Sequence, residues 1–303
     1  MGRPLVPGPG RGWDPGSWSE DQRITPAAAA CIRTLPGNSM NRQPENILVD
    51  CAARPVIAHR GASARAPENT IPAFAEARES GAEAFELDVH LSADGVPVVI
   101  HDADLARTTG RAGLVEALPF SALLGRDAGH EFSRDGGLTF PWRDRGVLVP
   151  SLGQVLEAFP GFPLLIELKS LAVAGPVAAL LLDRGAASRV VVASESHPAL
   201  KEFRQAPFLA GASRRDIAAL YFRPPGWPGP RSPRYRALAV PDRFGPLTVP
   251  SARFLARARR LGCPVHVWTV NDPIQARRFW AAGAAGMVTD DPATMLEARR
   301  GLP

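Results

Sequence analysis

The chain has 303 residues, of which 45% are hydrophobic, so it can bury the core of one α/β barrel of about 250 residues. It has no apolar run near the roughly 18 residues that a membrane span requires, and Cys31, Cys51 and Cys263 have neither a disulfide-framework nor a zinc-site spacing. The formal net charge of +5 favours attraction of anionic substrates over nucleic-acid binding, because no nucleic-acid motif accompanies it.

Residues 1–52 differ from the rest of the chain. They are rich in proline, glycine and arginine and show neither a helical nor a strand period, which predicts a disordered N-terminal extension before a single domain at 53–303. They contain no apolar core of a secretory signal, so a cytoplasmic protein is expected. Met40 begins MNRQPENILVD and is an alternative start.

The domain itself alternates short β-rich runs with helical patterns, which is typical of βα units around a parallel sheet. Helices are predicted at Ala73–Ser80 and Ala252–Leu261, each after a Ser or Thr cap and before a glycine. The predicted strands are Val56–His59, Ala84–Val89, Leu164–Lys169, Val190–Ser194, Phe208–Ala212, Ala237–Val240, Val265–Val270 and Gly286–Thr289. Eight such strands predict a TIM-type (β/α)8 barrel.

Two irregular segments interrupt this pattern. Gly125–Gly146 is rich in glycine and charged residues, and Arg223–Arg236 contains five prolines. Both are predicted to be loops.

The second predicted strand carries acidic residues on one face. Glu86 and Asp88 are two positions apart and therefore point to the same side, while Phe85, Leu87 and Val89 point to the other side and suit packing under helices.

A hairpin signal, Ser92-Ala93-Asp94-Gly95, follows this strand. A two-residue loop would set His101 opposite Asp88, and a four-residue loop would set it opposite Glu86. Either register predicts that His101 lies on the carboxylate face.

Glu167 and Lys169 share a face of a later strand in the same way. Carboxylates are hard oxygen ligands, so Glu86, Asp88 and Glu167 suit one divalent cation, Mg²⁺ or Ca²⁺. Three like charges in one barrel mouth would repel each other without it. The alternative is a salt-bridge network in which Glu86 pairs with Arg60 or Lys169.

The sequence resembles the glycerophosphodiester phosphodiesterase family through many fragments in the family's order, which together are far more specific than any single motif. The matching fragments are His59-Arg60-Gly61, Pro67-Glu68-Asn69-Thr70, Glu86-Leu87-Asp88, Asp94-Gly95, His101-Asp102, Arg107-Thr108-Thr109, Pro150-Ser151-Leu152, Glu167-Leu168-Lys169, Trp268-Thr269-Val270-Asn271 and Thr289-Asp290-Asp291-Pro292. The resemblance covers roughly Pro55 to Arg300 and implies a divalent cation at the three carboxylates. It also puts the two loops at the barrel rim, where one of them is a candidate selector of the substrate's alcohol group.

The resemblance also implies roles for individual residues. His59 and His101 form an acid–base pair, which suits histidine because its side chain titrates near neutral pH. Arg60 and Lys169 bind the phosphate, one as a planar fork and the other as a point charge.

The remaining motif residues also receive assignments. Trp268 is expected to line the glycerol pocket, with core packing as the alternative. Glu68 is an additional or indirect metal ligand, and Asn69 is either part of the site or a local cap. Asp290 and Asp291 are expected to cap the last helix.

The implied activity is hydrolysis of glycerophosphodiesters to glycerol 3-phosphate and an alcohol, with a small-molecule substrate and no stable membrane insertion. Attack by water and attack by the neighbouring glycerol hydroxyl both remain open. One alternative is headgroup release from lysophospholipids, in the manner of a lysophospholipase D. Another alternative is a non-catalytic barrel that serves as a binding module. A third is a phospholipase similar to the bacterial phosphatidylinositol enzymes, which would share the histidine pair but would not need the three carboxylates.

Overall fold

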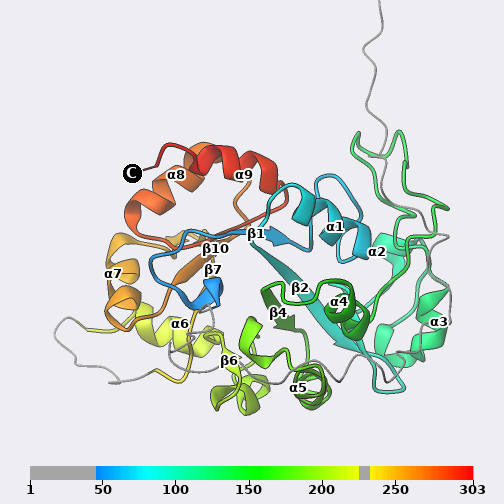
Figure 1. The fold of residues 1–303 in the computed structure, drawn as a ribbon, viewed down its shortest axis with the longest axis horizontal. Coiled ribbons are helices and arrows are strands. Elements are labelled where there is room, and N and C mark those ends of the chain that lie inside the picture. Colours follow the sequence, from blue (N-terminus) through cyan, green and yellow to red (C-terminus); the bar gives the residue numbers. More distant parts are fainter. Residues whose placement is uncertain (1–45, 225–232, 303) are drawn as a thin grey trace, which may run out of the picture. The chain divides into compact units, whose positions relative to one another are not determined.

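The structure, a computed structural model, describes residues 46–224 and 233–302. Most of the described chain alternates strands and helices (Figure 1). The strands are β1 (Val56–His59), β2 (Ala84–Leu91), β3 (Pro97–Val99), β4 (Leu164–Leu168), β5 (Val190–Ala193), β6 (Leu209–Ala210), β7 (Leu238–Pro241), β8 (Arg243–Phe244), β9 (Leu247–Thr248), β10 (Val265–Trp268) and β11 (Met287–Thr289). The α-helices are α1 (Ile71–Glu79), α2 (Ala106–Thr109), α3 (Phe120–Leu124), α4 (Leu152–Ala158), α5 (Ala174–Asp183), α6 (Arg214–Tyr221), α7 (Ala252–Arg260), α8 (Pro273–Ala282) and α9 (Pro292–Arg299).

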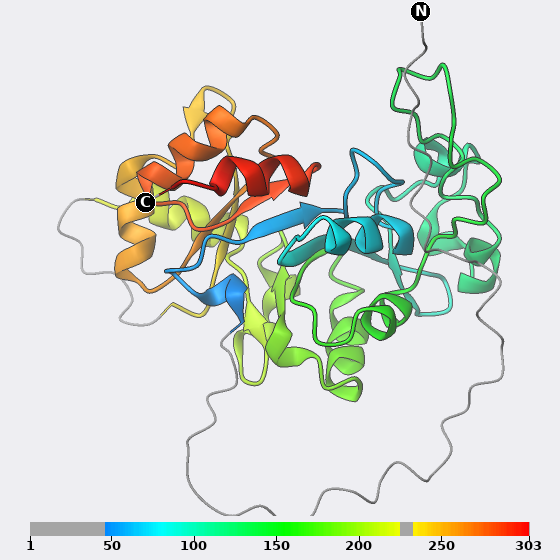
Figure 2. The same ribbon diagram turned by 45° about the horizontal axis from the view of Figure 1, so that its top comes forward.

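Eight parallel strands form the barrel. Their order is β6-β5-β4-β2-β1-β11-β10-β7, and a parallel bridge between Gly211 and Ala237 joins the two ends. Helices lie around the outside of these strands (Figures 1 and 2). All eight predicted strands are present with small shifts at their ends, so the predicted TIM-type barrel is confirmed.

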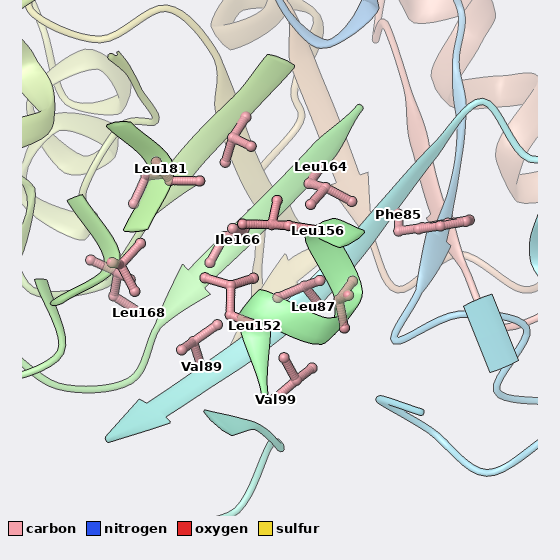
Figure 3. Packing of buried hydrophobic residues seen from close by; sticks show 14 of the residues in the cluster. Phe85, Leu87, Val89, Val99, Leu152, Leu156, Leu164, Ile166, Leu168 and Leu181 are labelled. Carbon is pink, nitrogen blue, oxygen red and sulfur yellow. The ribbon is translucent and has the colours of Figure 1, made fainter. Parts of the chain in front are cut away.

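The outer face of β2 packs under helices. Phe85, Leu87 and Val89 are fully buried in a cluster with Leu152 and Leu156 of α4 (Figure 3). Burying side chains of this size supplies much of the favourable free energy of folding. The alternation along β2 leaves Glu86 and Asp88 facing the inside of the barrel, as predicted.

The chain between β3 and α4 forms the rim insertion. Val98, Ile100, Leu105, Leu123 and Val147 are buried together in a small core of their own. The predicted loop at Gly125–Gly146 contains no helix or strand. The second predicted loop falls largely on residues 225–232, which lie outside the described residues.

The hairpin between β2 and β3 has a register that differs from both predicted ones. Val89 pairs with Val99 and Leu91 with Pro97, so five residues form the connection. The Ser92 hydroxyl accepts from the Val96 N–H, which stabilises this longer turn. Strand β3 ends at Val99, and a bend then carries His101 to the barrel mouth. His101 therefore lies on the predicted carboxylate side, but this bend places it there and not alternation along a strand.

Part of the predicted N-terminal extension is ordered. Of residues 1–52, the structure describes 46–52, and Ile47–Val49 forms a 3-10 helix. Leu48 is fully buried among Ile57, Leu165 and Val288, and its carbonyl lies 2.9 Å from Nε2 of His266. The boundary at residue 52 is therefore too late, because an apolar side chain before it packs against the barrel strands. Residues 1–45 lie outside the described part.

No helix in the described ranges combines the length and the apolar character needed to cross a bilayer.

Candidate active site

Three carboxylates meet at the mouth of the barrel. Glu86 and Asp88 lie on β2, and the register of β2 with β4 sets Asp88 beside Glu167. One ligand atom from each lies within 4.8 Å of the others. Within residues 46–224 and 233–302, this is the only group of three or more metal-ligating side chains so close together.

The pKa values of two of these carboxylates are shifted in opposite directions. Burial, and then repulsion from Asp88 and Glu167, raise the pKa of Glu86 well above its ordinary value. Burial would also raise the pKa of Asp88, but Lys169 and Arg60 outweigh it and lower that pKa. The cluster therefore favours additional positive charge, and its all-oxygen donor set fits Mg²⁺ or Ca²⁺.

The two cations at this site contact mainly Asp88. Lys169 Nζ lies 2.8 Å from Asp88 Oδ1 and 3.1 Å from Glu167 Oε2, and Arg60 Nε lies 3.2 Å from Asp88 Oδ2. Glu86 accepts from the backbone N–H of Arg60. The alternative salt-bridge network is thus present around Asp88 and Glu167, whereas Glu86 takes no part in an ion pair within the described ranges.

His59 is held by an aspartate from the other end of the chain. Its Nδ1 lies 2.6 Å from Asp290 Oδ1, and Asp290 also accepts from Ser63 and Asn271. Burial alone would raise the pKa of Asp290, but the hydrogen bonds from His59 and Asn271 outweigh it and lower that pKa to about 2. The carboxylate is therefore ionised, so Nδ1 of His59 donates and Nε2 is left available.

His101 has the same type of partner. Its Nδ1 lies 2.6 Å from Asp102 Oδ1. Burial alone would raise the pKa of Asp102, but hydrogen bonds from Arg107 and His101 lower it to about 2. Arg107 also donates to both oxygens of Glu68, and Glu68 accepts from Arg60. Glu68 thus belongs to a chain of ion pairs that joins the partner of His101 to Arg60.

All eight predicted site residues line one cavity of about 660 Å³. They are His59, Arg60, Glu86, Asp88, His101, Glu167, Lys169 and Trp268. Trp268 is 39% exposed, so it lines the cavity rather than packing in the core.

Two neighbouring residues, Asn69 and Asp290, have contacts that the sequence did not specify. Asn69 donates to Asp88 from 2.9 Å, while Thr70 is the cap of α1. Asp291 caps α9 as predicted, but Asp290 contacts His59 instead. The signal that could have found Asp290 is its place directly after a strand, where barrel active sites lie.

This arrangement defines a class of protein. The site lies at the carboxyl ends of the strands of a (β/α)8 barrel. It brings together three carboxylates that could bind a cation, two histidines that each contact an aspartate, and an arginine–lysine pair. Enzymes with this fold carry their active sites at that end. The groups present suit cleavage of a phosphoric diester, and the class is that of a barrel phosphodiester hydrolase.

Comparison with known proteins gives the family. Residues 59–294 match the glycerophosphoryl diester phosphodiesterase family, and the chain belongs to it. A glycerophosphodiester phosphodiesterase of Caldanaerobacter subterraneus is 32% identical over 250 residues, covering 80% of this chain and 96% of that protein.

Solved structures agree with the fold. A glycerophosphodiester phosphodiesterase from Thermotoga maritima has a TM-score of 0.62 and 26% identity, covering 81% of this chain and 98% of that one. A phosphodiesterase from Oleispira antarctica, in complex with its product sn-glycerol-3-phosphate, has a TM-score of 0.66 at 24% identity, covering 81% and 96%.

Proposed function

We propose that this chain hydrolyses glycerophosphodiesters to glycerol 3-phosphate and an alcohol, with His59 and His101 as the acid–base pair. The observation that carries the proposal is the matched pair of histidine–aspartate contacts at one cavity with the three carboxylates. The name of the Caldanaerobacter relative and the product bound in the Oleispira protein support the same substrate class.

In the proposed mechanism the two histidines move protons at Nε2. Each Nδ1 donates to an ionised aspartate, which fixes the tautomer and stabilises the protonated ring. One histidine accepts the proton of the attacking hydroxyl, from water or from the neighbouring glycerol hydroxyl. The other donates a proton to the leaving alcohol oxygen.

Binding of the phosphate falls to the cationic side chains. Arg60 and Lys169 both line the cavity and would neutralise the phosphate oxygens. Glu86, Asp88 and Glu167 would hold one divalent cation, which when bound supplies Lewis-acid polarisation of a phosphoryl oxygen. Trp268 would cover the glycerol.

The test is release of glycerol 3-phosphate and choline from glycerophosphocholine, with Mg²⁺ or Ca²⁺ and with EDTA. The wild type should be active only with a cation, and His59→Ala and His101→Ala should each lose about 10²-fold or more in kcat. His130→Ala is the matched control, because His130 lies outside the cavity. Equal activity of all variants, or no release by the wild type with either cation, would refute the proposal in favour of a binding module.

A further inference from the structure

His90 lies on the carboxylate face of β2 but outside the cavity. It follows Glu86 and Asp88 at the same two-residue spacing, so the three side chains share one face of the strand. The pairing of β2 with β4 ends at Val89, whereas His90 pairs with Val98 in the β2–β3 hairpin. His90 is not among the residues that line the cavity, and the proposed chemistry does not use it.

The imidazole of His90 contacts the backbone of His101. Its Nε2 atom lies 3.0 Å from the His101 carbonyl oxygen. A carbonyl oxygen only accepts hydrogen bonds, so Nε2 carries a proton and donates it. Within residues 46–224 and 233–302, this is the only hydrogen bond to the backbone of His101 or Asp102. The His90 side chain thus supplies a bond to a stretch of backbone that the strand pairing no longer holds.

This bond continues the attachment of the bend to β2. The Ile100 N–H donates to the Asp88 carbonyl from 3.0 Å, and the His90 bond then joins the next residue, His101, to the same strand. Strand β2 also carries the carboxylates Glu86 and Asp88. The position of the His101 backbone relative to these carboxylates is therefore set through one strand.

The other contacts of His101 restrain its ring. Asp102, which accepts from Nδ1, is the next residue in the chain, and Arg107 is five residues further on. Contacts between such near neighbours fix the ring relative to its own segment and not relative to the barrel. Glu68 joins this group to Arg60 through side chains alone. The His90 bond therefore restrains a part of His101 that the ion pairs do not reach.

We propose that His90 is a positioning residue, whose Nε2–H bond to the His101 carbonyl fixes the bend after β3 and so places the His101 ring at the cavity. The inference rests on the proposed function, because it takes His101 as a group that moves a proton. It gives His90 no contact with the substrate. A misplacement of about 1 Å can lower the rate of an enzymatic step about 10²-fold, so a single bond of this kind can control kcat.

The experiment compares two amides at position 90, with glycerophosphocholine as the substrate and Mg²⁺ or Ca²⁺ present. His90→Gln keeps an N–H donor near the place of Nε2, whereas His90→Asn carries the same amide one methylene short of it. We expect His90→Asn to lower kcat about tenfold or more with little change in KM, because Arg60 and Lys169 are untouched. His90→Gln should keep kcat within about twofold of the wild type.

Ser92→Ala is the matched control, because it weakens the same hairpin without touching His101. The Ser92 hydroxyl contacts Asp94 once and the backbone of Val96 twice. We expect this variant to unfold at a lower temperature than the wild type and to keep its kcat. An equal loss of kcat in Ser92→Ala would overturn the inference, and so would a loss in His90→Asn that His90→Gln shares.

Ring 15N spectra of the histidines give a readout that needs no turnover. At mildly alkaline pH the wild type should show His101 as one signal with its proton on Nδ1, identified by its loss in His101→Gln. In His90→Asn this signal should broaden or split, because the bend exchanges between positions, and in His90→Gln it should stay single.

The two readouts separate this inference from the proposed function. An unchanged His101 signal in His90→Asn would overturn the inference even if no variant hydrolyses glycerophosphocholine. The expected signals in a wild type without hydrolysis would support the His90–His101 bond and overturn the proposed function alone.

Discussion

The Nδ1 atom of His59 lies 2.6 Å from Oδ1 of Asp290, although 231 positions separate the two residues in the chain. The barrel produces this contact, because β1 and β11 are parallel neighbours and Ala58 pairs with Thr289. The residues that follow these two, His59 and Asp290, therefore emerge side by side at the mouth. The residue that follows the last strand thus orients the last residue of the first strand.

We expect Asp290→Asn to lower kcat by about 10²-fold with a small change in KM, because the amide cannot stabilise a protonated His59. The measurement is the pH dependence of kcat and kcat/KM. Asp291→Ala is the control, since the neighbouring Asp291 caps α9, and it should cost about 1 kcal/mol of stability with kcat retained. Equal losses of kcat in both variants would mean that Asp290 acts only through stability.

Arg107 offers a second test of the same kind. Its guanidinium donates to Asp102 and to both oxygens of Glu68. We expect Arg107→Lys to lower kcat about tenfold, because a single ammonium cannot replace the planar fork between two carboxylates. Arg111→Lys, at a neighbouring exposed position, should leave kcat unchanged. If Arg107→Lys kept full activity with an unaltered pH profile, the ion-pair chain would have no part in orienting His101.

The barrel strands and the inward face of β2 were predictable because both depend on local patterns. Alternation along β2 is enough to separate Glu86 and Asp88 from Phe85 and Leu87. The hairpin register was not predictable, since the Ser92–Val96 contact that lengthens the turn has no signal in the sequence motif. His101 reaches the cavity through the bend after β3, which alternation does not describe.

The partners of the histidines were missed for a different reason. An aspartate before a helix proline is a good cap, and Asp291 does cap α9. Only the closure of the barrel decides that Asp290 contacts His59. Leu48 was likewise assigned to the extension, because one apolar residue in a proline-rich stretch gives no periodic signal.

Cation binding should be measurable as a gain in thermal stability. We expect Mg²⁺ or Ca²⁺ to raise Tm of the wild type, by an amount equivalent to about 2.7 kcal/mol at 100 times Kd. Glu86→Gln should lose this gain, and without cation it should be at least as stable as the wild type, because one of three repelling charges is gone. Glu195→Gln, which lines the same cavity but is not part of the cluster, should keep the gain. An equal rise in Tm for Glu86→Gln would exclude these carboxylates as the site.

His266 is fully buried beside the Leu48 carbonyl, and burial lowers its pKa to about 4. Between the unfolded value near 6.5 and this folded value, the unfolded chain binds a proton that the folded chain does not. The contribution of His266 to the free energy of unfolding is therefore full above pH about 6.5 and is lost as the pH falls toward 4.

We expect His266→Gln, which keeps a donor for Leu48, to remove this part of the pH dependence. Between pH 7 and pH 4.5 the free energy of unfolding of the wild type should fall by about 2–3 kcal/mol more than that of the variant. Urea denaturation at the two pH values measures the difference, and titration of the acidic cluster cancels because both proteins contain it. His130→Gln should behave as the wild type does, since His130 makes no contact with this region of the barrel. Parallel pH profiles for wild type and His266→Gln would show that His266 titrates alike in both states, which its complete burial opposes.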